Sequence, residues 1–253
     1  MHDLVMICPT KGRPGQMQRL ARQCEATIRG NTVVVFVVDE DDPEVGTYAE
    51  IREGLNCKNL AMTIQPPTGR SGCLAPTNQV AMMFAASFDP SAFAIGFMGD
   101  DHWPMTPGWD VSLVEALRKL GAGLVYGNDL HHGERLPTSV AMTADIPRAL
   151  GYLAPPTFRH LYVDNYWLQL GQGADAIRYL PDVVIEHRHP IAGKAPMDHR
   201  YEVVNAPLMQ ALDKGALWGH VKSGAMARDV ELVRALRRAR GETEGEAACS
   251  TRP

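Results

Sequence analysis

The chain has 253 residues, of which 45% are hydrophobic and 21% are charged. This length suits one large domain, and this composition excludes an intrinsically disordered acidic chain and a coiled coil. With 25 Lys and Arg against 29 Asp and Glu, the net charge is −4. A protein that coats nucleic acid through a generally basic surface is therefore disfavoured.

The 5 cysteines are odd in number and show no CxxC spacing. A disulfide framework and a structural zinc site are therefore disfavoured. The N-terminal segment lacks the basic region of a signal peptide, and no apolar run reaches the roughly 18 residues of a spanning helix. We expect a cytoplasmic protein with reduced thiols.

Short apolar runs alternate with amphipathic segments along most of the chain. The runs predict buried strands at 4–8, 32–38, 61–65, 93–98, 124–126, 139–143, 176–180 and 183–186. The amphipathic segments predict helices at 16–28, 48–54, 76–87, 109–120, 145–150, 164–170, 199–214 and 227–240. This alternation is typical of an α/β fold, in which helices flank a mostly parallel central sheet.

The strand signal ends near Arg188, and only helices are predicted beyond it. We therefore expect a main domain over residues 1–205 and a C-terminal helical extension over 206–240. Residues 241–253 have few large apolar side chains, so we expect a disordered tail there.

Polar side chains cluster where the predicted strands end. Ligands of open α/β sheets bind at the carboxyl ends of the strands, so these positions are candidate site residues. They are Pro9, Thr10 and Arg13 after the first strand, Asp39 after the second, Asp100, Asp101 and His102 after 93–98, and His187 and His189 after the last.

Asp100 and Asp101 follow a buried strand, and paired carboxylates can hold a hard divalent cation that neutralises a diphosphate. An ordinary turn is the alternative. In an extended segment His187 and His189 lie on the same side, and neutral imidazole is a common metal ligand. A surface loop is the alternative for them. Together the two pairs favour a mixed Asp and His metal site.

Asp39 ends the strongest predicted strand and is a candidate acceptor of hydrogen bonds from a nucleotide, although a solvated turn before Pro43 would look the same. Arg13, Arg70 and Lys194 lie in loops rich in Gly and Pro and are candidates to clamp a diphosphate. Exposed surface charges are the alternative. No Walker A loop, GxGxxG motif or GxSxG elbow is present.

Asp164 lies at a predicted helix start, where a carboxylate serves either as a helix cap or as a general base. Trp109 lies at another helix start, where its ring stacks on a substrate or closes the helix against the core. The sequence leaves both choices open.

In this order the residues resemble a glycosyltransferase of the GT-A fold, close to the family 2 type, over residues 4–201. The loop Cys8 to Pro14 is similar to the loop after that family's first strand. Asp39 occupies the place of the aspartate that contacts the nucleotide base. The Gly69-Arg70-Ser71 loop and Asn78 resemble the Gly-rich loop and helix that follow.

The Gly99-Asp100-Asp101 segment resembles the family's Asp-x-Asp motif, with Gly99 in place of the first aspartate. The resemblance assigns Asp101 to the metal and Asp100 to the nucleotide sugar. Further matches are the Pro107-Gly108-Trp109 turn, the Val163-Asp164-Asn165 acidic motif, in which Val163 departs from the usual acidic residue, and the late metal-binding histidine, which is His187 or alternatively His189. The short length and the C-terminal pattern resemble glycosyltransferases of bacteriophage genomes.

The resemblance implies a transferase of the hexosyltransferase type that uses Mn2+ or Mg2+ and inverts the anomeric carbon. It would move a sugar from a nucleoside-diphosphate sugar to a hydroxyl of an unknown acceptor, such as a protein, a DNA base, a glycan or a small molecule. Asp164 would be the catalytic base, and Trp109 would lie on the acceptor side. A phage-encoded chain would act in the host cytoplasm.

Two other functions compete with this expectation. A nucleotidyltransferase binds nucleoside triphosphates on a related sheet, although the TKGRPG loop fits its signature only in part. A non-catalytic nucleotide-sugar-binding protein would explain Gly99 and Val163. The predicted helix 227–240 has an apolar stripe of Val230, Val233 and Leu236 beside several arginines, which suits packing on the domain, an anionic acceptor or a membrane surface.

Overall fold

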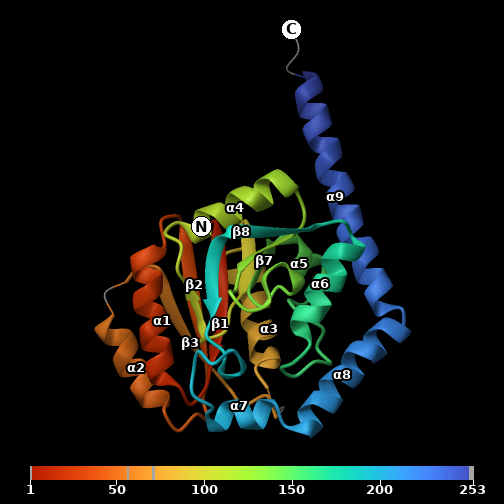
Figure 1. The fold of residues 1–253 in the computed structure, drawn as a ribbon. Coiled ribbons are helices and arrows are strands. Elements are labelled where there is room, and N and C mark those ends of the chain that lie inside the picture. Colours follow the sequence, from red (N-terminus) through yellow and green to blue (C-terminus); the bar gives the residue numbers. More distant parts are fainter. Residues whose placement is uncertain (1, 56, 70–71, 251–253) are drawn as a thin grey trace.

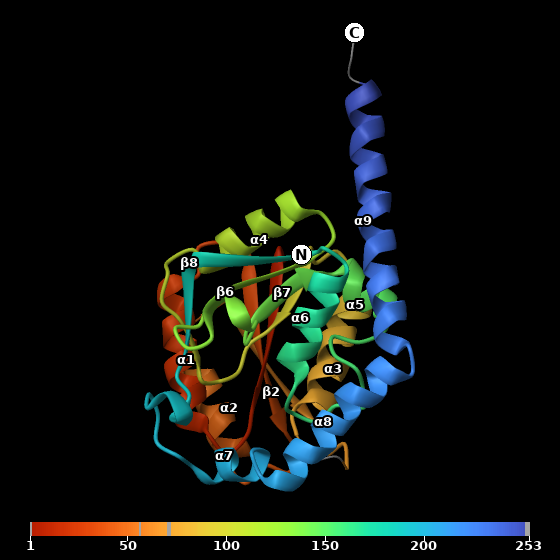
Figure 2. The ribbon, with the colours of Figure 1, turned by 45° about the vertical axis from the view of Figure 1, so that its right-hand side comes forward.

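The computed structural model describes residues 2–55, 57–69 and 72–250, and from residue 241 on it describes the backbone alone. A central eight-stranded sheet has helices on both faces (Figures 1 and 2). Its strands lie in the order β3-β2-β1-β4-β7-β6-β8-β5. Their bounds are β1 Leu4–Thr10, β2 Thr32–Asp39, β3 Leu60–Gln65, β4 Ala94–Phe97, β5 His102–Pro104, β6 Leu124–Asn128, β7 Val140–Thr143 and β8 Ile177–His187.

The α-helices are α1 Pro14–Thr27, α2 Val45–Gly54, α3 Leu74–Met83, α4 Trp109–Leu120, α5 Asp145–Leu150, α6 Val163–Gly173, α7 His199–Val204, α8 Pro207–Lys222 and α9 Ala225–Ser250. A π-helical turn, Phe84–Phe88, continues α3. None of the helices in the described part of the chain is long and apolar enough to cross a lipid bilayer.

Strands β1 and β2 are buried on both faces, which explains their nearly continuous apolar sequences. Because side chains alternate along a strand, each strand supplies both layers of the core. Val5 and Ile7 pack in the layer that contains α3 and α6. Leu4 and Met6 pack in the layer that contains α1 and α4.

The sheet is mixed in direction. Parallel pairing joins β1 to β2 and β4, β2 to β3, and β6 to β8. Antiparallel pairing joins β7 to β4 and β6, and β5 to β8. The carboxyl ends of β1, β2 and β4 therefore lie at one edge, and α7 lies beneath that edge in Figure 1.

Two predicted elements differ from the structure. The separate strands expected at 176–180 and 183–186 form one strand, β8, which pairs first with β6 and then with β5. The helix expected at 199–214 is broken into α7 and α8, because Ala206 precedes Pro207 and is extended, with ψ of 144°. A residue before proline is disfavoured in helical conformation.

The C-terminal helices share the core of the sheet. Val230 and Val233 of α9 are buried in the same cluster as Trp167 of α6. The guanidinium groups of Arg234 and Arg237 donate to the carbonyls of Gly173 and Ala174 at the end of α6. The packed alternative for the predicted helix 227–240 is therefore supported. The domain boundary at 205 and the disorder of 241–253 stay predictions, with 251–253 outside the described residues.

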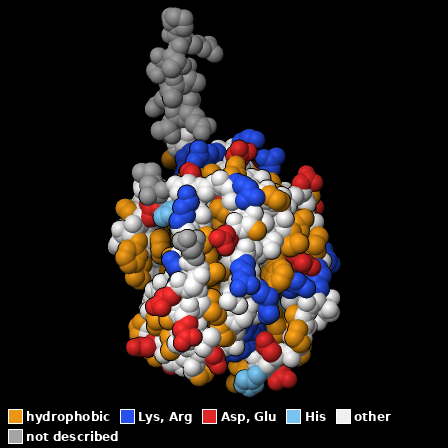
Figure 3. Space-filling model, turned by 90° about the vertical axis from the view of Figure 1, so that its left-hand side faces the viewer, with side chains coloured by type: hydrophobic (Ala, Val, Ile, Leu, Met, Phe, Trp, Pro, Cys, Tyr) orange, Lys and Arg blue, Asp and Glu red, His pale blue; other side chains and the backbone are white. Residues whose placement is uncertain are grey.

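The face over α1 and α2 mixes both signs of charge. Figure 3 shows Lys and Arg side chains interspersed with Asp and Glu on it.

Candidate active site

A cavity of about 390 Å³ opens at the carboxyl ends of β1, β2 and β4. Its size is within the range of small-molecule sites. Its polar lining residues are Thr10, Lys11, Arg13, Asp39, Asp100, Asp101, Thr138, Tyr162, Asp164, Arg200, Tyr201 and Asn205, together with six histidines, His102, His131, His132, His160, His187 and His189. Six of the nine histidines of the chain thus meet at one place.

Asp100 is buried between the first loop and the β4 end. Its carboxylate accepts a 2.8 Å hydrogen bond from Oγ1 of Thr10 and a 3.3 Å bond from Nη1 of Arg13. Burial and the neighbouring Asp101 raise the pKa of Asp100 to about 6, although Arg13 opposes the shift. Arg13 also bonds Asp198 at 2.8 Å and lies over the ring of Tyr201.

Asp101 faces two imidazoles and one phenol. Its Oδ1 lies 3.0 Å from Nδ1 of His102, and its Oδ2 lies 3.5 Å from Nε2 of His187. The hydroxyl of Tyr201 donates a 2.6 Å hydrogen bond to Oδ2. Burial favours the neutral acid, but the two histidines outweigh it and hold the pKa of Asp101 well below its ordinary value.

The pKa values of His102 and His187, the two histidines beside Asp101, are shifted in opposite directions. Burial and the proximity of His187 lower the pKa of His102. Burial also opposes protonation of His187, but its contact with Asp101 outweighs this and raises its pKa. Burial and His187 lower the pKa of His189 to about 4, so His189 is a neutral imidazole near pH 7.

Lys11 and Asp39 line the cavity at the ends of β1 and β2. Nζ of Lys11 donates to Asp39 at 2.8 Å and to Asp41 at 2.7 Å. Asp42 is buried and accepts the backbone N–H of Gly12 at 2.6 Å, which fixes the first loop against the second. Within the acidic cluster, Asp39 therefore lines the cavity, whereas Asp42 holds the two loops together.

Asp164 is the second residue of α6 and also lines the cavity. Its Oδ1 accepts the backbone N–H of Asn165 at 2.8 Å, and burial raises its pKa. Tyr162, just before α6, has a left-handed backbone with φ of 62°. This conformation is unfavourable for a residue with a side chain and turns the chain sharply into α6.

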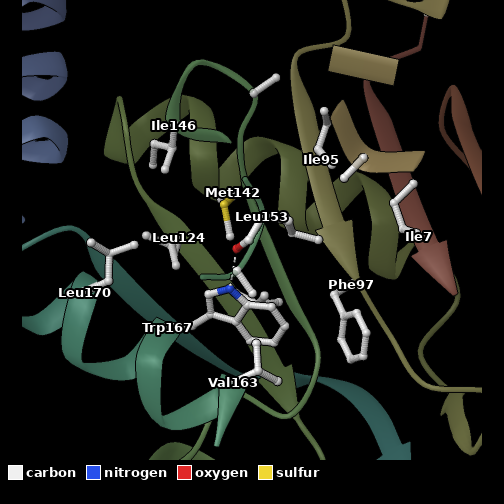
Figure 4. Close-up of a cluster of buried hydrophobic side chains, with 14 of the residues drawn as sticks. Ile7, Ile95, Phe97, Leu124, Met142, Ile146, Leu153, Val163, Trp167 and Leu170 are labelled. Carbon is white, nitrogen blue, oxygen red and sulfur yellow. Dashed lines mark hydrogen bonds between the residues drawn. The ribbon is translucent and has the colours of Figure 1, made fainter. Parts of the chain in front are cut away.

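Core contacts hold α6 in place. Trp167 is fully buried, its Nε1 donates to the carbonyl of Leu153 at 2.9 Å, and its ring packs 5.3 Å from that of Phe97 (Figure 4). In the segment before α6, the backbone N–H groups of residues 159–161 donate to the buried carboxylate of Asp213 in α8. The position of Asp164 is therefore set by the core and by a C-terminal helix.

Sequence comparison finds no match, either to a protein-family model or to a curated protein. Solved structures do match. A mannosyltransferase, PcManGT from Pyrobaculum calidifontis, in complex with GDP-Man and Mn2+, has a TM-score of 0.56 at 14% identity and covers 92% of this chain and 80% of its own. Residues 1–349 of S. aureus TarS with UDP-GlcNAc give a TM-score of 0.53 at 11% identity, over 83% and 69%.

The chain has the GT-A fold. At these identities the likeness shows the fold alone. A 4-diphosphocytidyl-2C-methyl-D-erythritol synthase from Anaerococcus prevotii also matches, with a TM-score of 0.51 at 12% identity, over 82% of this chain and 96% of its own. The fold by itself does not separate sugar transfer from that class of enzyme.

Most of the predicted site residues line the cavity of this GT-A domain. They are Pro9, Thr10, Arg13, Asp39, Asp100, Asp101, Asp164 and His187, and the alternative His189 lies there as well. The structure thus brings together side chains from five segments that are far apart in the sequence.

Three predicted residues lie elsewhere. The amide of Asn78 bonds the backbone of Leu153 and Ala154, so it joins α3 to the loop before α6. Lys194 pairs with Glu186 at 3.0 Å outside the cavity. Trp109 is fully buried in the core beneath α4, so its ring is not on the cavity surface. Arg70 lies outside the described residues.

Several cavity residues were missed by sequence reasoning. His102 was expected at the same strand end as Asp101 but was given no role as a ligand, although its imidazole is 3.0 Å from that carboxylate. Arg200 and Tyr201 come from α7, beyond the last strand. Cys73 and His160 form a 3.2 Å contact across the cavity wall. The abundance of histidine near strand ends is the signal that was available.

Proposed function

We propose that this chain is a metal-dependent glycosyltransferase of the hexosyltransferase type, which moves a sugar from a nucleoside-diphosphate sugar to an acceptor hydroxyl. The observation that carries the proposal is that Asp101 with His187, the cations of the first loop, and Asp164 all face one cavity. The fold likeness to proteins solved with GDP-Man and Mn2+ or with UDP-GlcNAc supports the same activity.

The residues present fit a divalent cation. Asp101 and His187 offer an oxygen and a nitrogen 3.5 Å apart, and Nδ1 of His187 is buried with no hydrogen-bond partner among the described residues. Asp101 and His187 would hold the ion, with Mn2+ or Mg2+ the candidates. A bound cation would stabilise the nucleoside diphosphate as a leaving group.

Other residues bind the donor. Asp39 offers a partly exposed carboxylate oxygen to the nucleotide, next to the ammonium of Lys11. Arg13 and Lys11 suit the diphosphate, because a guanidinium and an ammonium bind phosphate oxygens strongly. Each is already paired with a carboxylate, so a diphosphate competes with Asp198 and Asp39 for them.

Asp164 is the proposed base. Its carboxylate takes the proton of the acceptor hydroxyl while that oxygen attacks the anomeric carbon. The bond between that carbon and the phosphate oxygen breaks, and the nucleoside diphosphate leaves on the opposite side, which inverts the anomeric centre. The raised pKa of Asp164 makes its carboxylate a stronger base than an ordinary aspartate.

A nucleotidyltransferase remains the second candidate, because the synthase from Anaerococcus prevotii shares the fold over most of both chains. Product analysis separates the two. The protein is incubated with Mn2+ and either nucleoside-diphosphate sugars or nucleoside triphosphates with sugar phosphates. Release of nucleoside diphosphate supports sugar transfer, whereas release of pyrophosphate supports nucleotidyl transfer. Donor binding without either product would indicate a non-catalytic binding protein.

The origin and the acceptor belong to the same proposal. A bacteriophage source, and action in the host cytoplasm, rest on the short length and the C-terminal sequence pattern. The acceptor is left open among proteins, DNA bases, glycans and small molecules.

A further inference from the structure

The short strand β5 places two histidines directly opposite each other. β5 runs antiparallel to β8, and His102 is the direct partner of His187 in this ladder. Side chains of direct partners point to the same face of a sheet. The two imidazole rings accordingly stack, with centroids 4.2 Å apart and planes 15° apart. The pairing of β5 with β8, rather than closeness in the sequence, brings the two histidines together.

Asp101 meets both rings. It precedes His102 in the chain, and its two oxygens face one ring each, Oδ1 at 3.0 Å from Nδ1 of His102 and Oδ2 at 3.5 Å from Nε2 of His187. One ligand atom from each of the three residues lies within 4.8 Å of the others. Three metal-ligating groups, two of them on paired strands, thus lie close together.

The hydrogen bonding of the two rings is incomplete. Nε2 of His102 and Nδ1 of His187 are buried and have no partner among the described residues. Nδ1 of His102 lies 3.1 Å from the backbone N–H of Gly99 and 3.0 Å from Oδ1 of Asp101. In the tautomer with its proton on Nε2, Nδ1 accepts the Gly99 N–H and its lone pair faces the carboxylate, so a cation held between Nδ1 and Oδ1 would take the place of that N–H contact. A neutral imidazole with its lone pair directed beside a carboxylate is the form that binds a metal.

We propose that His102 is a third protein ligand of the cation, beside Asp101 and His187. This rests on the metal site of the proposed function and deepens it. One carboxylate and two imidazoles form a nitrogen-rich set, which suits Mn2+, Co2+ and Zn2+ better than Mg2+, an ion that prefers oxygen ligands and retains its waters. The site is therefore selective for a transition-metal ion.

A purely structural role for His102 makes a different prediction. If the two rings only pack against each other, His102 contributes no nitrogen to the ion, and its replacement leaves the order of metal affinities unchanged. The two roles of His102 are therefore distinguished by the number of imidazoles bound to the ion and by the order of metal affinities, rather than by transfer activity.

The experiment uses the full chain, stripped of metal with a chelator and kept free of donor. Pulsed electron paramagnetic resonance of bound Mn2+ counts the coupled imidazole nitrogens, and calorimetry gives the affinities for Mn2+, Co2+ and Mg2+. Three variants are compared with the wild type: His102→Gln, His187→Gln and, as the matched control, His132→Gln, which removes another histidine of the same cavity.

Two imidazole couplings are expected in the wild type and in His132→Gln, and one in each of the other variants. Affinity for Mn2+ should fall by about 10- to 100-fold in His102→Gln, since even outer-shell partners of metal ligands have effects of this size. A single coupling in the wild type overturns the proposal, whether or not the variants fold. The proposal is also overturned if folded His102→Gln has the same ratio of Mn2+ affinity to Mg2+ affinity as the wild type.

The result is separable from the proposed function. Two couplings with no turnover of any nucleoside-diphosphate sugar would support the ligand set and contradict sugar transfer. Mn2+-dependent transfer with a single imidazole coupling would support sugar transfer and contradict the proposed ligand set.

Discussion

The hydroxyl of Tyr201 donates a 2.6 Å hydrogen bond to Oδ2 of Asp101, across 100 positions of sequence. This bond joins α7 to the carboxylate that would hold the cation. The ring of Tyr201 also lies under the guanidinium of Arg13, 4.0 Å from its centroid. Tyr201, which lies close to the predicted domain boundary at residue 205, thus contacts both Asp101 and Arg13 in the site.

Tyr201→Phe should destabilise the protein. The variant removes a buried hydrogen bond to an ionised carboxylate, and such bonds contribute about 1.5–3 kcal/mol. Urea unfolding should show a loss of free energy of unfolding in that range. Tyr179→Phe is the control, because no hydrogen bond of its hydroxyl is found among the described residues and it lies outside the cavity. Equal stability of the two variants would show that the Tyr201 bond contributes little.

Asp164→Asn should abolish most sugar transfer while metal and donor still bind. The amide keeps the shape of the side chain but does not accept the acceptor's proton, and a general base contributes about 10²- to 10⁴-fold in rate. Calorimetry with Mn2+ and the donor, followed by a transfer assay, measures both effects. Asp182→Asn, an exposed position on β8, is the control. Full transfer by Asp164→Asn would remove Asp164 from the base role.

The rate of transfer should depend on the protonation of Asp164. Burial raises its pKa, so the reactive carboxylate forms only above a pH that is higher than for an ordinary aspartate. The acidic limb of kcat/KM, measured at saturating Mn2+, should therefore lie above the range of exposed aspartates. It should be absent from the residual activity of Asp164→Asn. An acidic limb that persists unchanged in this variant would assign the titration to another group.

Asp213→Ala should loosen the segment before α6. The carboxylate accepts three backbone N–H groups, from Arg159, His160 and Leu161, and is fully buried. Because unpaired buried donors are costly, we expect a loss of at least about 3 kcal/mol in the free energy of unfolding and faster amide exchange at 159–161. Lys214→Ala, the exposed neighbour, should change neither. Unchanged exchange in a folded Asp213→Ala would show that the segment is held by other contacts.

Much of this site could be predicted from local sequence. The apolar runs that form β1 and β2 are long enough to identify, and the loops after them carry Pro9, Thr10, Arg13 and Asp39 to one edge. A parallel sheet places such residues together by its topology alone. Asp101 was predicted for the same reason.

Contacts that depend on distant pairing could not be predicted in this way. β5 has three residues, and its partner β8 lies far along the chain, so nothing near His102 indicates that His187 faces it. Trp109 has the same local sequence whether it faces a substrate or the core, and only packing decides. Lys194 and Asn78 lie outside the cavity lining, where they contact Glu186 and the loop before α6, and nothing in their local sequence indicates these partners.

The central claim is that the cavity binds a nucleoside-diphosphate sugar through a cation held by Asp101. Release of nucleoside diphosphate from UDP- and GDP-sugars, measured with and without Mn2+ for the wild type and for Asp101→Ala, tests it most directly. We expect Mn2+-dependent release by the wild type, with a loss of about 100-fold or more in the variant, since metal catalysis supplies several kcal/mol to such a step. Equal release by the two proteins, or release that does not respond to Mn2+, would show that Asp101 holds no catalytic cation.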